Sequence, residues 1–182
     1  MTNTWFKYID LNEYYSKKIN FLNLSAGDGS VVVSFAETYG KHVNSKYYCI
    51  DPWEDYSDYS GNTKYKTQRE TTFALFLDNI NSNGITNKVV VTRGYSIYEI
   101  PKFVDSFFDI IYVNGHTTPD LVLEELVLSF RKLISGGIIV FDDFYYGGPD
   151  EYTRAIYCFT SGYYSKIKVL GEEGSKVFIQ KI

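Results

Sequence analysis

The residues best suited to proton transfer and cation binding follow two apolar, strand-like runs. Asn114-Gly115-His116 comes after Ile110–Val113, and Asp142-Asp143 comes after Ile138–Phe141. Two adjacent carboxylates repel each other unless a positive group lies beside them, so the pair predicts a hard divalent cation; the alternative is that Asp143 caps a turn and Asp142 is solvated. His116, one of two histidines, suits a general base near neutral pH, although a lone loop histidine is more often a surface residue.

A second candidate site begins where the run Phe21–Leu24 ends. Small residues follow as Ser25-Ala26-Gly27-Asp28-Gly29, before an amphipathic helix. Glycines let the backbone turn sharply and approach a ligand, and the helix offers its first amides to a carboxylate or phosphate. Asp51 ends the next strand-like run, where its carboxylate could accept both hydroxyls of a ribose; otherwise it caps a helix that starts at Pro52.

Three neighbouring features bear on the kind of cofactor. Val32 stands where a dinucleotide fingerprint needs its third glycine, which favours a mononucleoside-type cofactor over NAD. Pro52-Trp53 offers a flat apolar surface for an adenosine, although packing of Trp53 in the core explains it equally well. Ser96, after Arg93-Gly94-Tyr95, could bond an adenine edge, or the segment is an ordinary turn.

Alternating strand and helix patterns must position these residues. Five near-continuous apolar runs read as strands buried on both faces: Phe21–Leu24, Tyr47–Ile50, Val89–Thr92, Ile110–Val113 and Ile138–Phe141. Helical candidates lie between them at Val31–Tyr39, Thr71–Ser82 and Leu121–Leu133, and a hairpin closes the chain at Ile167–Leu170 and Val177–Ile182. The pattern predicts a single doubly wound α/β domain over residues 1–182, with a mostly parallel sheet and an antiparallel last pair. The polar, Tyr-rich stretch Glu54–Glu70 is a candidate lid.

Composition narrows the function classes. The 182 residues are 45% hydrophobic, enough for one core, and the net charge of −4 without a basic stripe argues against a nucleic-acid partner. Two distant cysteines indicate neither a disulfide framework nor a zinc site. The start of the chain lacks a secretory signal and no apolar run reaches membrane-spanning length, so we expect a cytoplasmic protein without a membrane partner. An aromatic content of 18% is compatible with a homodimer face.

Four stretches keep the order and spacing of a known set of motifs: Asn23–Gly29, Cys49–Trp53, Phe108–Gly115 and Leu133–Asp143. They resemble the successive motifs of class I S-adenosylmethionine-dependent methyltransferases, and more narrowly the O-methyltransferases that act on sugar and antibiotic hydroxyls. The resemblance spans the chain from Phe21 to Asp143 and implies a seven-stranded, Rossmann-like sheet.

The resemblance also implies roles for the residues above. Ser25, Ala26, Gly27 and Gly29 would approach the methionine part of S-adenosylmethionine, Asp51 would hold its ribose, and Pro52, Trp53 and Ser96 would border the adenosine. The methyl group would face a cleft between Asn114 and Asp142. His116 would be the base, and Asp142, Asp143 and Asn114 would hold a magnesium ion beside a small hydroxylated acceptor such as a sugar.

Departures from the family pattern leave a second hypothesis. Asn23 replaces the usual acid before the turn, Ser25 the usual first glycine, and Ser135 the proline of a Pro-Gly-Gly turn. Asn114 stands where metal-dependent members carry Asp, and the lost charge should weaken cation binding. Asn114, together with the short segment before the first strand, favours the alternative of an inactive relative that binds the cofactor as a partner or regulatory subunit.

Overall fold

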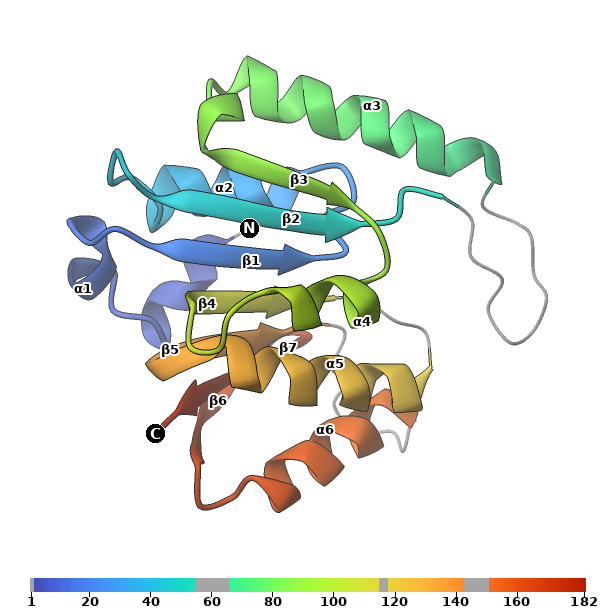
Figure 1. The fold of residues 1–182 in the computed structure, drawn as a ribbon. Coiled ribbons are helices and arrows are strands. Elements are labelled where there is room, and N and C mark those ends of the chain that lie inside the picture. Colours follow the sequence, from blue (N-terminus) through green and yellow to red (C-terminus); the bar gives the residue numbers. More distant parts are fainter. Residues whose placement is uncertain (1, 55–65, 115–117, 143–150) are drawn as a thin grey trace.

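One mixed sheet forms the centre of the protein (Figure 1). The computed structural model describes residues 2–54, 66–114, 118–142 and 151–182. Within them the strands are β1 (Asn20–Leu24), β2 (Lys46–Asp51), β3 (Val89–Arg93), β4 (Phe108–Val113), β5 (Leu133–Phe141), β6 (Ile167–Glu173) and β7 (Lys176–Lys181). The seven strands lie in the order β3-β2-β1-β4-β5-β7-β6; β1 to β5 are parallel, and β7 is antiparallel to both β5 and β6. The predicted fold class is confirmed.

Helices cover both faces of this sheet (Figure 1). The α-helices are α1 (Leu11–Tyr15), α2 (Ser30–Thr38), α3 (Lys66–Ser82), α4 (Ser96–Glu99), α5 (Pro119–Lys132) and α6 (Glu151–Gly162), and the 3-10 helices are η1 (Thr2–Lys7), η2 (Thr86–Lys88) and η3 (Ile100–Lys102). Side chains of η1, α1, α2 and α3 pack on one face, and those of α5 and α6 on the other. In the described parts of the chain, no helix combines the length and the apolar character needed to cross a bilayer.

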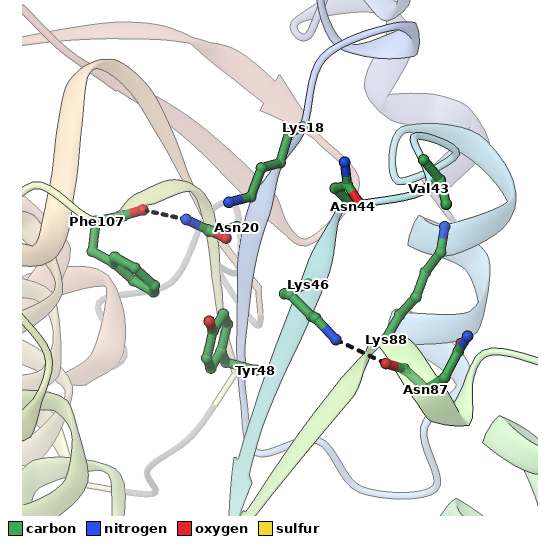
Figure 2. A pocket seen from close by; sticks show the side chains of 9 residues that line it. All are labelled: Lys18, Asn20, Val43, Asn44, Lys46, Tyr48, Asn87, Lys88 and Phe107. Atoms are coloured by element: carbon green, nitrogen blue, oxygen red, sulfur yellow. Dashed lines mark hydrogen bonds between the residues drawn. The ribbon is translucent and has the colours of Figure 1, made fainter.

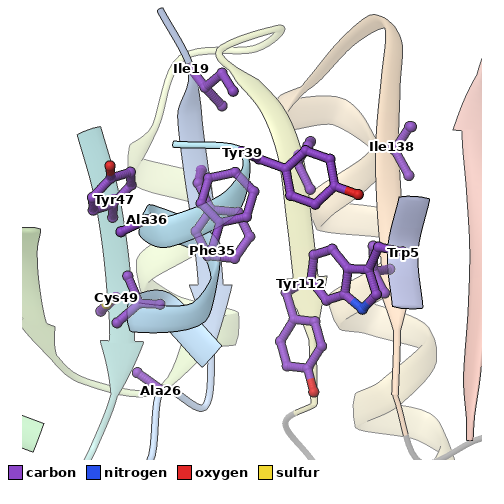
Figure 3. Close-up of a cluster of buried hydrophobic side chains, with 14 of the residues drawn as sticks. Trp5, Ile19, Ala26, Phe35, Ala36, Tyr39, Tyr47, Cys49, Tyr112 and Ile138 are labelled. Atoms are coloured by element: carbon purple, nitrogen blue, oxygen red, sulfur yellow. The ribbon is translucent and has the colours of Figure 1, made fainter. Parts of the chain in front are cut away.

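Two apolar layers hold the helices to the sheet because side chains alternate between faces along each strand. Phe21 of β1 belongs to the layer under α2, where its ring stacks on Phe35 with centroids 3.8 Å apart. The next residue, Leu22, belongs to the layer under α5 and α6. Figure 3 shows part of the first layer, in which Trp5 of η1 lies beside Tyr112 of β4. This burial on both sides explains why the parallel strands read as continuous apolar runs.

The start of β5 departs from the regular ladder. Leu133 pairs with Phe108, and the next regular pair is Ile138 with Ile110, so β5 carries extra residues between two close positions of β4. The predicted turn Ser135-Gly136-Gly137 forms this irregular stretch. Gly137 is buried there, and a Cβ on it would lie 2.9 Å from the Asp109 carbonyl oxygen. The position therefore has room for glycine alone.

We predict that Gly137→Ala destabilises the protein by about 1–3 kcal/mol, because the added methyl group overlaps the Asp109 carbonyl and the Leu133 side chain. Urea unfolding measures the change. The matched control is Gly162→Ala at the end of α6, where a Cβ would meet no atom within 4 Å and should not lower stability. Equal stability of the two variants would contradict the steric argument.

Candidate functional site at the carboxyl ends of the parallel strands

The turn between β1 and α2 is built from left-handed backbone. Ser25, Gly27 and Gly29 have φ angles of 55°, 54° and 83°. Gly29 is the N-cap residue of α2, and a Cβ on it would also press on the ring of Phe76, at 3.0 Å. The Asp28 carboxylate accepts a bond from the Ser30 amide at 2.9 Å and so holds the first turn of α2. Glycine is favoured at positions 27 and 29 by backbone conformation, as the sequence pattern predicts.

The acid that ends β2 binds this turn directly. One Asp51 oxygen accepts the Gly27 amide at 3.0 Å, and the other accepts the Trp53 amide at 2.7 Å. The residue is only 1% exposed. The two features that the sequence singles out are therefore one bonded unit, because β1 and β2 are parallel neighbours and their ends meet at the same rim.

Trp53 lies in the core, so of the two roles left open for it the structure favours packing over a surface for adenosine. Its side chain is fully buried, and its ring centroid lies 4.8 Å from the centroids of both Phe73 and Phe76. The indole N–H donates to the Gly27 carbonyl at 2.8 Å. Asp51 and Trp53 thus hold the N–H and the C=O of Gly27. We call Gly27, Asp51 and Trp53 the turn clamp.

The end of β3 joins the same region. The Gly94 amide donates to the Asp51 carbonyl at 3.2 Å, and the Arg93 guanidinium lies 4.7 Å from the Phe73 ring centroid. Ser96, predicted to border an adenine, is the first residue of α4 and is 6% exposed. Pro52 is half-buried. These residues lie at the rim where we expect them.

A buried amide lies one step inside this rim. Asn23 of β1 is fully buried between Cys49 of β2 and Tyr112 of β4, and within the described ranges neither polar atom of its side chain has a hydrogen-bond partner. Burial raises the pKa of the Cys49 thiol, helped by the Asp51 charge, so this neighbour is uncharged. An unsatisfied buried amide costs about 1–3 kcal/mol, a cost that a polar ligand group would offset.

The Asp142 carboxylate follows β5 and is surrounded by donors. One oxygen accepts a short hydrogen bond from the Tyr112 hydroxyl and lies 2.8 Å from the Lys176 ammonium; the other accepts the Ser175 hydroxyl at 2.5 Å. Asp142 is 7% exposed. Lys176 therefore supplies a positive charge beside Asp142, and the second acid of the predicted pair, Asp143, lies outside the described residues. Among the described residues, no group of three or more His, Cys, Asp or Glu side chains could hold a metal ion.

The remaining predicted residues divide into two groups. Asn114 follows β4, and because Val113 pairs with Phe141, Asn114 and Asp142 end neighbouring strands as predicted. The described residues do not include His116, Asp143 or most of the candidate lid Glu54–Glu70.

Sequence reasoning missed Ser175 and Lys176. They come to the site because β7 is antiparallel to β5, which puts the start of β7 beside the end of β5. The sequence predicts the hairpin, so the position of Ser175 and Lys176 at its turn was the one signal that could have pointed to them. The partner strand of β7 was not identifiable from apolar pattern alone.

The opposite rim carries a separate hollow of about 540 Å³ (Figure 2). Lys18, Lys46 and Lys88 line it at the amino ends of the strands. The Lys46 ammonium donates to the Asn87 carbonyl at 2.8 Å and the Lys88 ammonium to the His42 carbonyl at 3.0 Å. These two charges therefore hold backbone carbonyls at the strand starts.

Comparison with known proteins agrees with this arrangement. A family model described as a methyltransferase domain matches residues 24–144, from the end of β1 to just beyond β5. No curated protein matches the chain.

Solved structures share the fold at low sequence identity. A candidate rRNA methylase from Clostridium thermocellum superposes with a TM-score of 0.69 at 17% identity, covering 98% of this chain and 92% of its own. The O-methyltransferase TomG from Streptomyces achromogenes, involved in tomaymycin synthesis and solved with S-adenosylmethionine, gives 0.67 at 12%, covering 100% and 81%. A candidate O-methyltransferase from Klebsiella pneumoniae gives 0.67 at 11%, again covering 100% and 81%.

We predict that Asp51→Asn loosens the turn clamp and costs about 1–3 kcal/mol of stability. In the native protein each Asp51 oxygen accepts one backbone N–H, from Gly27 or from Trp53. The side chain of Asn has only one oxygen, so its NH2 group would face one of these two N–H donors and that hydrogen bond would be lost. Asp28→Asn is the control, since exposed Asp28 accepts one backbone bond, which an amide oxygen can replace. Equal melting temperatures for the two variants would refute this role of Asp51.

Proposed function

This chain belongs to the methyltransferase-domain family, and from that premise we propose that it transfers the methyl group of S-adenosylmethionine to a hydroxyl oxygen of a small acceptor, such as a sugar. The observation that carries the proposal is the turn clamp. It fixes the glycine turn and Asp51 at adjacent strand ends, within the strand order β3-β2-β1-β4-β5-β7-β6.

The proposed cofactor contacts follow from the clamp. Ser25, Ala26, Gly27 and Gly29 approach the methionine part, and Asp51 accepts the ribose hydroxyls. Asp51 already accepts the Gly27 amide on one oxygen and the Trp53 amide on the other, and a carboxylate offers about four acceptor sites in all. Since Asp51 is 1% exposed, ribose binding requires a local displacement of the atoms that cover it.

Two further residues complete the cofactor site in this proposal. Asn23 supplies the buried amide that lacks a protein partner in the described ranges, and a polar group of the cofactor would satisfy it. Ser96 borders the adenine beside Pro52, while Trp53 acts indirectly by holding Gly27.

The cofactor, when bound, supplies a methyl group activated on a sulfonium. The acceptor oxygen forms a bond to the methyl carbon as the carbon–sulfur bond breaks, and the hydroxyl proton leaves to a base. The protein aligns the acceptor in the cleft between Asn114 and Asp142 and takes up that proton. We assign the base to His116, two residues after Asn114.

The acceptor class rests on charge and resemblance. Of the three solved structures compared above, two are described as O-methyltransferases and one as a candidate rRNA methylase. A net charge of −4 disfavours an RNA backbone as the partner of this chain. A small hydroxylated acceptor is therefore our choice.

Calorimetric titration with S-adenosylmethionine and, separately, NAD tests the proposal. We expect binding of the first only, because Val32 is fully buried where a dinucleotide would need a glycine. Binding of NAD alone would overturn the proposal. Binding of S-adenosylmethionine without turnover on any hydroxylated acceptor would instead favour the alternative of an inactive, cofactor-binding partner subunit.

We predict that His116→Ala lowers kcat by about 10²–10⁴-fold and leaves the Kd of S-adenosylmethionine within about twofold, since a general base acts on the acceptor proton and not on the cofactor. The chain offers one matched control, His42→Ala. The backbone carbonyl of His42 accepts Lys88 at the opposite rim, so turnover should not change. Unchanged turnover in His116→Ala would remove His116 from the mechanism.

A further inference from the structure

We propose that Lys176 is a built-in cation: it occupies the place of a divalent metal at the ends of β4 and β5, and methyl transfer by this protein needs no metal. The first half rests on the geometry of Asp142. The second half rests on the proposed function.

The ammonium group is placed where a metal would have to be. The Lys176 Nζ atom lies 2.8 Å from Asp142 Oδ2, with the side chains 16% and 9% exposed. This pair is therefore shielded from solvent more than an ordinary surface salt bridge.

The Asp142 carboxylate has little capacity left for a metal. A carboxylate offers about four acceptor sites. The Tyr112 hydroxyl and Lys176 share Oδ2, and the Ser175 hydroxyl takes a site on Oδ1. A metal on Oδ2 would meet the Lys176 ammonium at close range and would have to displace it.

The fold fixes Lys176 in this position. Lys176 is the first residue of β7, and the following residue, Val177, pairs with Phe141, the last residue of β5. The Tyr8 hydroxyl donates to the Glu172 carbonyl at 2.6 Å, which ties the hairpin to the N-terminal segment. Lys176 therefore lies at a turn that is held by strand pairing and by a hydrogen bond to the N-terminal segment.

The neighbouring charges agree with a one-charge cation. Hard divalent cations favour several anionic oxygens. Among the described residues, Asn114, on the adjacent strand end, is neutral, and Lys176 balances the Asp142 charge. Asp143, the third residue of the predicted metal site, lies outside them. Without a metal to acidify the acceptor hydroxyl, removal of its proton depends on a side-chain base.

A titration with Mn²⁺, monitored by electron paramagnetic resonance without cofactor or acceptor, tests whether Lys176 occupies the place of a metal. We expect no binding to the wild type at up to about millimolar Mn²⁺, and none to Lys176→Arg, which keeps the charge. In Lys176→Met the stem remains but the charge is lost, so we expect Mn²⁺ to bind at Asp142 with a Kd at least about tenfold below the highest concentration that leaves the wild type unbound. A folded Lys176→Met that binds no more Mn²⁺ than the wild type would count against Lys176 as the group that excludes the metal. Lys102→Met, which removes an exposed lysine from Glu99, should behave as wild type.

Turnover in Mg²⁺ and in EDTA tests the second half, and we expect the two rates to agree within about twofold. Mn²⁺ binding to the wild type that Asp142→Asn abolishes, or loss of turnover in EDTA, would overturn the proposal. If Lys176→Met does not fold, the wild type, Lys176→Arg and Asp142→Asn titrations still decide it. Failure of the proposed function is distinguishable, because it appears in the cofactor titration and leaves the Mn²⁺ result intact.

Discussion

The candidate site depends on the Gly27 peptide unit being held from both sides. Asp51 accepts its N–H and the Trp53 indole donates to its C=O, so the segment after β2 fixes the turn after β1. The left-handed φ of Gly27 and the start of α2 both follow from that turn. Because the acid proposed to bind ribose also stabilises the turn, ligand affinity and folding stability are coupled at this position.

The strands were predictable because each is buried on both faces, which leaves a continuous apolar run in the sequence. Their predicted ends differ from the observed ones mainly where pairing continues past the apolar core, as at Phe108 and Leu133. The sequence patterns do not predict η1, α1 or α6. Trp5 illustrates the reason: its ring stacks on Tyr112, with centroids 5.7 Å apart, and no local periodicity reports a contact so distant along the chain.

The site was likewise predictable where it depends on strand ends, and not where it depends on contacts between distant residues. Asp51 and the glycine turn could be joined in advance because parallel neighbours end at one rim. The role of Trp53 could not, since its partner Gly27 lies 26 positions earlier. For the adjacent carboxylates Asp142 and Asp143 the sequence predicted a divalent cation as the positive neighbour, whereas the positive group beside Asp142 in the described residues is Lys176. The source of the charge depended on which strand pairs with β5, and that is a property of the tertiary fold.

The Asp142–Lys176 pair also bears on the energetics of the proposed transfer. Positive charge leaves the sulfur as the methyl group moves to oxygen, so the transition state carries less charge on sulfur than the ground state. An unpaired carboxylate beside the sulfonium would stabilise the ground state more than the transition state and raise the barrier. Lys176 cancels that charge at 2.8 Å, while Tyr112, packed against Trp5, holds the carboxylate in place. A carboxylate whose charge is paired therefore suits a reaction that consumes charge and works mainly by alignment.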